Sequence, residues 1–92
     1  ATANPLDDAA KSGDLAQLEQ LLDDGADVNA VGPFGSALHW ASLNGHVDAV
    51  KLLVEKGVDP DAVSNSLGTP LHAAARRDHA PVAKALIDAG AN

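Results

Sequence analysis

The sequence predicts an all-α repeat solenoid, in which three helix-turn-helix units stack in chain order and extended β-turn loops join them. Residues 35–57 and 68–90 correspond when one is shifted by 33 positions, with these equivalents: Leu38 and Leu71, His39 and His72, Ala41 and Ala74, His46 and His79, Leu53 and Leu86, Gly57 and Gly90. An earlier copy aligns with a shift of 32, with these equivalents: Leu6 and Leu38, Ala9 and Ala41, Gly13 and Gly45, Leu21 and Leu53, Gly25 and Gly57. A fixed period of this length is typical of stacked helical repeats.

The composition favours thin helical layers over a thick globular core. Hydrophobic residues make up 46% of the 92 positions, but Trp40 and Phe34 are the only aromatic ones. The core must therefore come from Leu, Val and Ala, whose small side chains allow helices to pack closely. A chain of this length has room for one domain. We expect a single domain over residues 1–92, with repeats at about 5–29, 30–62 and 63–92.

The first unit is predicted to begin with a short helix over Pro5–Ser12. Gly13 ends this helix, because glycine adopts the left-handed conformation of a helix end without steric cost. Asp14 is the predicted N-cap of a second helix over about 15–24. Its leucines recur at three- and four-residue spacing and form the predicted buried stripe: Leu15, Leu18, Leu21 and Leu22.

The second and third units repeat this plan. Helices are predicted at about 37–44 and 47–56, and then at about 70–77 and 80–89. The inward stripe of the second unit is Val47, Val50, Leu53 and Val54. The stripe of the third unit is smaller in volume: Ala80, Ala83, Leu86 and Ile87.

The two outer faces of the stack differ in polarity. Charged residues of the first unit replace uncharged ones of the second: Asp7, Asp8 and Lys11 stand in place of His39, Trp40 and Leu43. The third unit shows no comparable change, so we expect a further repeat, a C-terminal helix or a partner protein to cover the C-terminal face. The alternative is that this alanine-rich face exposes too little apolar area to need a cover.

The repeat resembles the ankyrin repeat. The resemblance is carried by recurring elements: Thr69-Pro70-Leu71-His72 with its variant Ser36-Ala37-Leu38-His39, then Ala41 or Ala74-Ala75, Gly45-His46 with its variant Asp78-His79, and the closing Gly57-Val58-Asp59 and Gly25-Ala26-Asp27-Val28-Asn29. It covers the chain from about Leu6 onward and implies an ankyrin-like solenoid. It further implies that the first histidine pair bonds to Ser36, Thr69 and neighbouring backbone, and that the second pair ties adjacent loops.

Members of the ankyrin family usually bind proteins in a concave groove lined by the ends of the first helices and by the turn tips. Carried over to this sequence, the candidate protein-binding residues are Phe34, Pro33, Leu43, Asn44, Leu67, Arg76 and Arg77. An aromatic residue with arginines is the composition that interface hot spots favour. Two alternatives stay open: Phe34 and Leu67 fold back onto neighbouring turns, and the arginines are solvated. Trp40 is expected to pack between units rather than to face a ligand.

The charge of the chain argues against two classes of partner. The formal net charge is −7, with 13 acidic and 6 basic residues, which repels nucleic acid phosphates and anionic membrane surfaces. We therefore expect neither nucleic acid nor a membrane as partner. The absence of cysteine excludes disulfides without fixing the compartment. The opening Ala-Thr-Ala-Asn-Pro suits a mature exported protein as well as a cloning boundary of a cytoplasmic one.

No motif predicts catalysis, a cofactor or a metal site. The four histidines occupy equivalent repeat positions, which favours a scaffolding role, and a zinc site needs three or four converging ligands. Ser36, His39 and Asp48 supply the residue types of a catalytic triad, but nothing places a base beside a nucleophile. Calcium-loop and glycine-rich nucleotide motifs are absent. We expect a protein that is not an enzyme.

Two functions remain open at this point. The first is a protein–protein interaction module that holds a partner segment in its concave groove. The second is a structural or regulatory domain docked on a larger multidomain enzyme, including an exported one. In the second case the C-terminal face is the junction.

Overall fold

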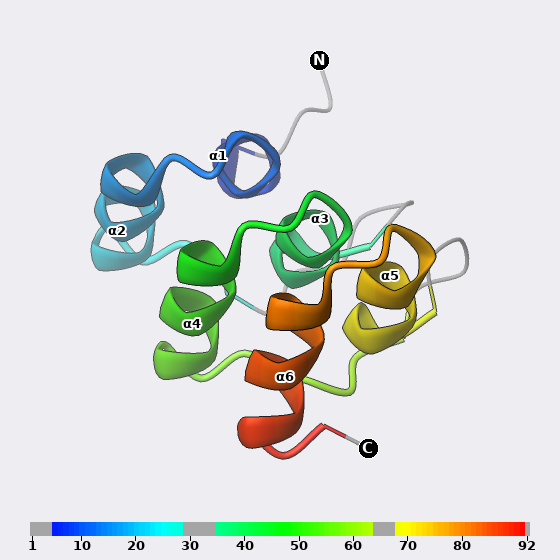
Figure 1. Cartoon of the computed structure of the whole chain (residues 1–92). Coiled ribbons are helices and arrows are strands. Elements are labelled where there is room, and N and C mark those ends of the chain that lie inside the picture. Colours follow the sequence, from blue (N-terminus) through cyan, green and yellow to red (C-terminus); the bar gives the residue numbers. More distant parts are fainter. Residues whose placement is uncertain (1–4, 29–34, 64–67, 92) are drawn as a thin grey trace.

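A computed structural model describes residues 5–28, 35–63 and 68–91 of the chain. The described residues form six helices (Figure 1): α1 (Pro5–Ser12), α2 (Leu15–Asp23), α3 (Ala37–Leu43), α4 (Val47–Glu55), α5 (Pro70–Arg76) and α6 (Ala80–Asp88). Consecutive helices pair as α1 with α2, α3 with α4 and α5 with α6. The pairs stack in chain order, so the predicted all-α repeat fold is confirmed.

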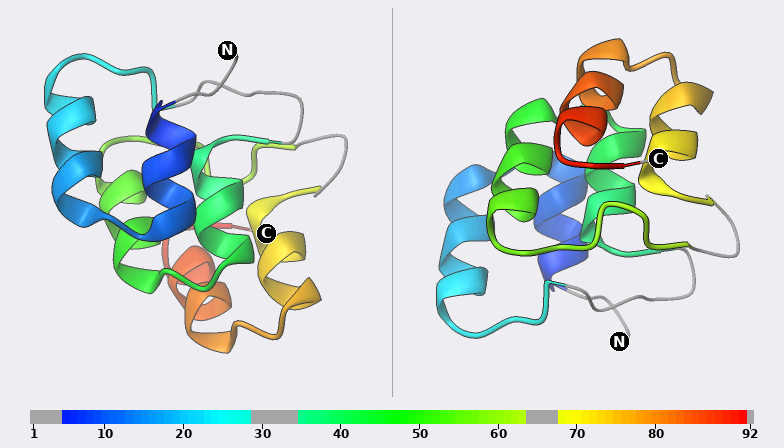
Figure 2. Two further views of the ribbon diagram at one scale, coloured as in Figure 1. Left: turned by 90° about the horizontal axis from the view of Figure 1, so that it is seen from above. Right: turned by 90° about the horizontal axis from the view of Figure 1, so that it is seen from below.

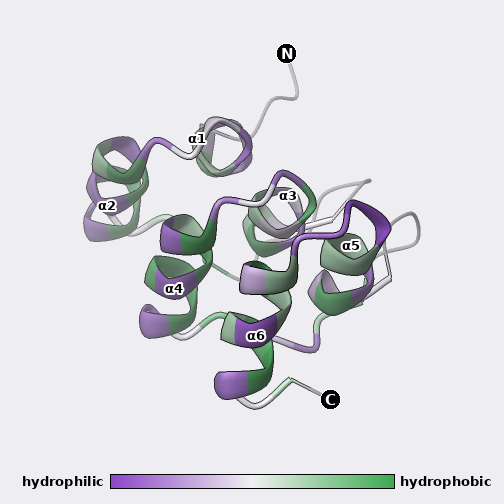
Figure 3. Cartoon of the chain, viewed as in Figure 1, coloured by the Kyte–Doolittle hydropathy of each residue, from purple (hydrophilic) through white to green (hydrophobic). Residues whose placement is uncertain are grey.

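The stack has two rows of helices. Helices α1, α3 and α5 pack side by side as the inner row, and α2, α4 and α6 form the outer row (Figures 1 and 2). Coloured by hydropathy, the helices carry hydrophobic segments on some sides and hydrophilic ones on others (Figure 3). Each pair thus covers apolar surface of its neighbour, as a solenoid requires.

The helix boundaries follow from their caps. Helix α1 has the predicted bounds, whereas the other five end one residue earlier than predicted. In each case the predicted last residue is the C-cap: Asp24, Asn44, Lys56, Arg77 and Ala89. After α2, Gly25 N donates to Leu22 O and Ala26 N donates to Leu21 O, while Gly25 has φ of 96°. This arrangement satisfies carbonyl groups that a helix end leaves open.

The core is built from Leu, Val and Ala, as predicted. The largest aliphatic side chains with 0% exposure are Leu18, Leu38, Leu53, Leu86, Val50 and Val82. Leu53 therefore lies in the stack as expected. Alanines of the inner helices, such as Ala41 and Ala74, are also fully buried and allow the inner row to pack closely.

Two of the predicted stripes were partly wrong. In α6 the buried residues are Val82 and Leu86, whereas Ile87 is 56% exposed and Ala80 is exposed. The predicted face with Ile87 and the observed face with Val82 both fit a three- and four-residue spacing. Only the face with Val82 packs against α4 and α5. In α2, Leu18 is fully buried, while Leu15 at the first position is 37% exposed.

The first unit has the predicted polar character. Asp8 and Lys11 are exposed, and Asp7 is half-buried. Burial raises the pKa of the Asp7 carboxyl group, the Lys11 charge lowers it and the Asp8 charge raises it further, with burial the largest effect. The Oδ1 atom of Asp7 is buried without a hydrogen-bond partner. Among the described residues, the polar outer face thus includes one buried oxygen atom whose hydrogen-bonding capacity is not satisfied.

Candidate functional site

The candidate site lies at the C-terminal ends of the inner helices. Leu43 and Arg76 are the last residues of α3 and α5, and Asn44 and Arg77 follow them as C-caps. Because α3 packs against α5, these four predicted residues lie along one edge of the inner row. Three further predicted residues lie outside the described part of the chain: Pro33, Phe34 and Leu67.

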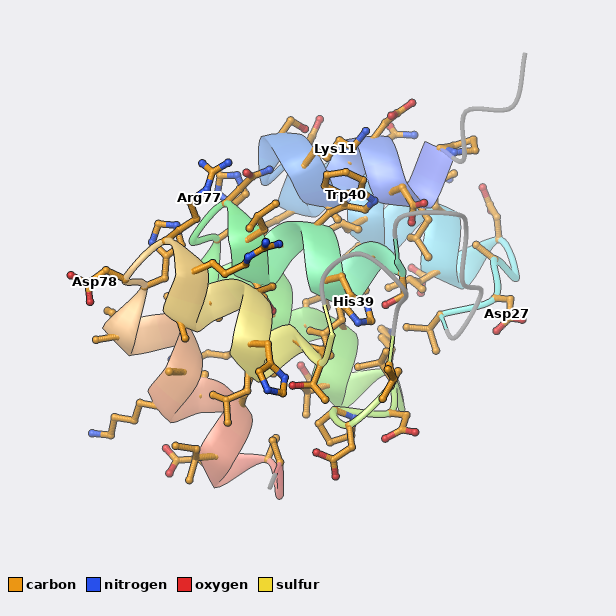
Figure 4. All side chains as sticks on the ribbon, turned by 90° about the vertical axis from the view of Figure 1, so that its right-hand side faces the viewer. Lys11, Asp27, His39, Trp40, Arg77 and Asp78 are labelled. Atoms are coloured by element: carbon orange, nitrogen blue, oxygen red, sulfur yellow. The ribbon has the colours of Figure 1, made fainter. Side chains whose placement is uncertain are left out.

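A cation–π contact joins the first and second units at this edge. The Lys11 Nζ atom lies 4.2 Å from the centroid of the Trp40 ring. Trp40 is half-buried and packs against the hydrophobic core, and Figure 4 shows it beside Lys11. A contact of this kind is worth about 0.5–1 kcal/mol at exposed sites. Trp40 therefore packs between units, as expected, and keeps part of its ring accessible beside a cation.

The carbonyl oxygen of Lys11 is a second tie between the same units. It accepts a hydrogen bond from Asn44 Nδ2 at 3.1 Å and lies 2.8 Å from His46 Nε2. The sequence interpretation treated Asn44 as a binding residue only. In the structure its amide nitrogen also holds the second unit on the first, which leaves the side-chain oxygen for a partner.

Exposed arginines continue the edge into the third unit. Arg76 and Arg77 are both exposed, and Figure 4 shows Arg77 beside Asp78 at the turn between α5 and α6. With Lys11 they account for three of the 6 basic residues in a chain of formal net charge −7. The inner-helix ends thus combine positive charge with the half-buried side chains of Trp40 and Leu43.

The buried histidine of the second unit is a structural residue. His39 is 0% exposed, and its Nδ1 accepts from the backbone N–H of Ser36 at 3.0 Å. The proton must therefore sit on Nε2, which donates to Gly68 O at 2.8 Å. Burial lowers the pKa of His39, against a smaller raising effect of backbone hydrogen bonds to Gly68 and Ala62. The neutral ring thus links the second unit to the third.

His72 and His46 also fit the roles that the repeat pattern implied. His72 Nδ1 lies 2.7 Å from Thr69 Oγ1, and His46 ties the first two loops through Lys11. Within the described residues, no group of three or more His, Cys, Asp or Glu side chains converges as a metal site.

Shallow depressions occur on the outer row of helices. One of about 350 Å³ lies between α4 and α6 and is lined by Lys51, Val54, Glu55, Ala85, Asp88 and Ala89. Its mixed charges show no preference for a ligand type. Among the described helices, none is long and apolar enough to cross a membrane.

The paired helices, the left-handed turns and the histidine ties match a known repeat family. A family profile described as "Ankyrin repeats (3 copies)" matches residues 6–92. The chain belongs to the ankyrin repeat family. Repeats of this family generally mediate protein–protein interaction.

Relatives of this ankyrin chain occur in larger proteins. It is 37% identical over 86 residues to Palmitoyltransferase Hip14 of Drosophila melanogaster, an alignment that covers 91% of this chain and 14% of that protein. It is 44% identical over 68 residues to Neurogenic locus notch homolog protein 1 of Homo sapiens, covering 73% of this chain and 3% of that protein. The chain thus spans a small part of each relative.

A solved structure shows the same fold. The human ASB11 ankyrin repeat domain superposes with a TM-score of 0.91 at 36% sequence identity. The superposition covers 98% of this chain and 41% of the ASB11 chain.

Proposed function

We propose that this ankyrin chain is a non-enzymatic protein-binding module that holds a partner segment along the ends of its inner helices. The observation that carries the proposal is the edge formed by Lys11, Trp40, Leu43, Arg76 and Arg77, where three inner helices end side by side. This edge combines accessible apolar surface with positive charge on an otherwise acidic protein.

The residue types suit recognition of a protein segment. Tryptophan and arginine are enriched among residues that dominate binding energy, because they bury a large area and also donate hydrogen bonds. A guanidinium group donates two parallel hydrogen bonds to a carboxylate, which fixes orientation as well as charge. Trp40 and Leu43 would contact apolar side chains, and the arginines would bind acidic ones. The turn residues Pro33, Phe34 and Leu67 belong to the same proposal as the rim of the groove.

Affinity capture tests this proposal. The chain is used to capture proteins from its source cells, and the captured protein is identified by mass spectrometry and purified. Binding is then measured with the variant Phe34→Ala, Arg76→Ala, Arg77→Ala. We expect capture to be lost while the helical circular dichroism signal is unchanged. The control variant Lys51→Ala, Lys84→Ala removes two exposed charges from the outer helices and should bind as the parent does. Retained binding by the triple variant would refute the groove assignment.

A second function is favoured by the length of the relatives. The alignment with the Drosophila palmitoyltransferase covers 14% of that protein, so repeats of this kind occur within much larger enzymes. Under this alternative the chain is a structural or regulatory domain docked on a catalytic domain of the same polypeptide. The full-length gene sequence distinguishes the two, because only the alternative requires a catalytic domain in it.

A further inference from the structure

An Asn-Gly pair lies at the turn between α3 and α4. Asn44 is the C-cap of α3, Gly45 follows it with φ of 77°, and the sequence contains no other Asn-Gly pair. The Asn44 side chain is exposed. An asparagine amide is open to attack by the backbone nitrogen of the next residue, and a glycine there has no side chain to hinder the approach. The equivalent turns of the other units have different residues: Ser12-Gly13 and Arg77-Asp78.

The reaction that this pair favours is deamidation, and it needs only water. The Gly45 nitrogen attacks the Asn44 Cγ atom, a new N–Cγ bond closes a succinimide ring, and the Cγ–Nδ2 bond breaks. The amide nitrogen leaves as ammonia, together with the proton that the Gly45 nitrogen gives up. Water then opens the ring at either carbonyl carbon. Opening at Cγ breaks the new N–Cγ bond and gives aspartate, whereas opening at the main-chain carbonyl carbon gives isoaspartate, in which the backbone runs through Cβ.

The folded turn keeps the reacting atoms apart. Asn44 has ψ of 0°, so the Gly45 nitrogen eclipses the nitrogen of Asn44 rather than its Cβ atom. The Gly45 N–H donates to Ser42 O at 3.3 Å. The Asn44 amide is held as well, because Nδ2 donates to Lys11 O of the first unit at 3.1 Å. Ring closure therefore requires the turn to rotate and the hydrogen bond to the first unit to break, so its rate should follow local opening of this edge.

The products would weaken the contact that holds the reaction back. Lys11 O accepts from Asn44 Nδ2 and also from His46 Nε2, the latter at 2.8 Å. An aspartate has no donor for this carbonyl oxygen, and its negative charge lies at the end of α3, where the helix dipole is negative too. An isoaspartate adds a main-chain atom directly before Gly45, which displaces His46 from its bond. Each product therefore removes a tie between the first and second units.

We propose that Asn44-Gly45 is a site of spontaneous deamidation, that the docked first unit delays the reaction, and that the product loosens this unit from the second. Loss of ammonia makes the change irreversible in dilute solution. Each opening of the edge adds product, and the product favours further opening. The turn thus records how long the first unit has spent away from the second. This reaction needs no partner protein in the groove.

Ageing of the full 92-residue chain tests for the site and its protection. The chain is incubated in mildly alkaline buffer with and without urea, and deamidation at each asparagine is followed by peptide mapping with mass spectrometry. Asn29 and Asn65 are internal references, because alanine and serine follow them. In urea we expect Asn44 to react faster than both references. Without urea the rate at Asn44 should be about tenfold lower or less, since the turn must open first.

Two matched variants show whether the first unit supplies the protection. Leu18→Val trims a fully buried side chain of the first unit, and Leu86→Val trims one of the third. Circular dichroism verifies that both variants are folded. We expect Leu18→Val to speed the reaction at Asn44 by about threefold or more, and Leu86→Val to speed it less. Equal acceleration would refute protection by the first unit. Equal rates with and without urea would refute protection by the fold, and a rate in urea no higher than that of the references would refute the site.

Asn44→Asp reproduces one of the two products. We expect its Tm to lie about 4 °C or more below that of the parent, with faster amide hydrogen exchange in α1 and α2. Asn44→Gln is the control, because its longer side chain closes a ring far more slowly and keeps an amide donor. Ageing should leave position 44 of this variant unmodified. Unchanged Tm and exchange in Asn44→Asp would refute the loosening of the first unit.

Discussion

His39 donates a hydrogen bond from Nε2 to the carbonyl oxygen of Gly68 at a distance of 2.8 Å. The bond joins the start of the second helix pair to the start of the third, and its donor side chain, His39, is fully buried. The same ring accepts from the N–H of Ser36 through Nδ1. The neutral His39 ring thus bonds both to the start of its own helix and to the next unit. Among the described residues, the equivalent His72 bonds only to the start of its own helix.

We predict that His39→Ala destabilises the protein by about 2–4 kcal/mol, because it leaves a cavity and buried polar groups without partners. His72→Ala is the matched control. It removes the equivalent ring at an exposed position and should cost about 1 kcal/mol or less. Urea unfolding followed by circular dichroism gives both values. Equal losses would show that the bond to Gly68 contributes nothing.

Stability should also depend on pH through His39. Burial holds the pKa of the folded His39 below its ordinary value of 6.5, so the unfolded chain binds the proton more readily. The contribution of the neutral His39 ring to the free energy of unfolding is fully present above pH 6.5. It is lost as the pH falls below that value toward the pKa of the folded state. Unfolding free energies measured between pH 5 and 8 should fall on acidification. The slope should be smaller in His39→Gln, which has no titrating ring.

Asp7 has the opposite effect on the pH dependence of stability, and it acts at lower pH than His39. Its pKa is raised above the ordinary 3.8 by burial, so the folded protein binds the proton more readily than the unfolded chain. An unchanged slope between pH 6.5 and 5 in His39→Gln would therefore contradict the His39 assignment, because Asp7 cannot supply that loss.

Glycines of the chain should differ in their tolerance of alanine. Gly45 has φ of 77° and would place a new Cβ atom 2.6 Å from His79 Nδ1, whereas Gly57 has φ of 95° and no atom within 4 Å of a new Cβ atom. Gly57→Ala should cost about 1–2 kcal/mol for the left-handed backbone alone. Gly45→Ala should cost more, because the histidine must also move. The difference should shrink when His79→Ser is added, and equal costs in urea unfolding would argue against the contact.

Repeat spacing made much of this structure predictable, since glycines follow most of the helices and histidines recur at two equivalent positions of the second and third units. The buried face of α6 was less predictable. Val82 and Ile87 each fit a helical stripe, and only the position of α4 and α5 decides that Val82 is buried. The bonds from His39 to Gly68 and from Asn44 to Lys11 could also not be predicted from the sequence. They join residues 29 and 33 positions apart, so they depend on how one unit is set on the next.

Ser42 offers a route to a more stable protein. Its side chain is 0% exposed, and its Oγ atom is buried with no hydrogen-bond partner. The equivalent residues of the other units are Ala10 and Ala75. We predict that Ser42→Ala raises the free energy of unfolding by about 1 kcal/mol, because it removes an unsatisfied polar group and adds a better helix former.

Ser36→Ala is the control for this change. Ser36 is equally buried, but its Oγ atom lies 2.9 Å from His39 Nδ1 at the start of α3. Removing this hydroxyl should lower stability by about 1 kcal/mol, as the loss of an N-cap residue does. Thermal unfolding of the two variants should therefore shift Tm in opposite directions. A lower Tm for Ser42→Ala would mean that its hydroxyl has a partner in solution, and that the second unit depends on it.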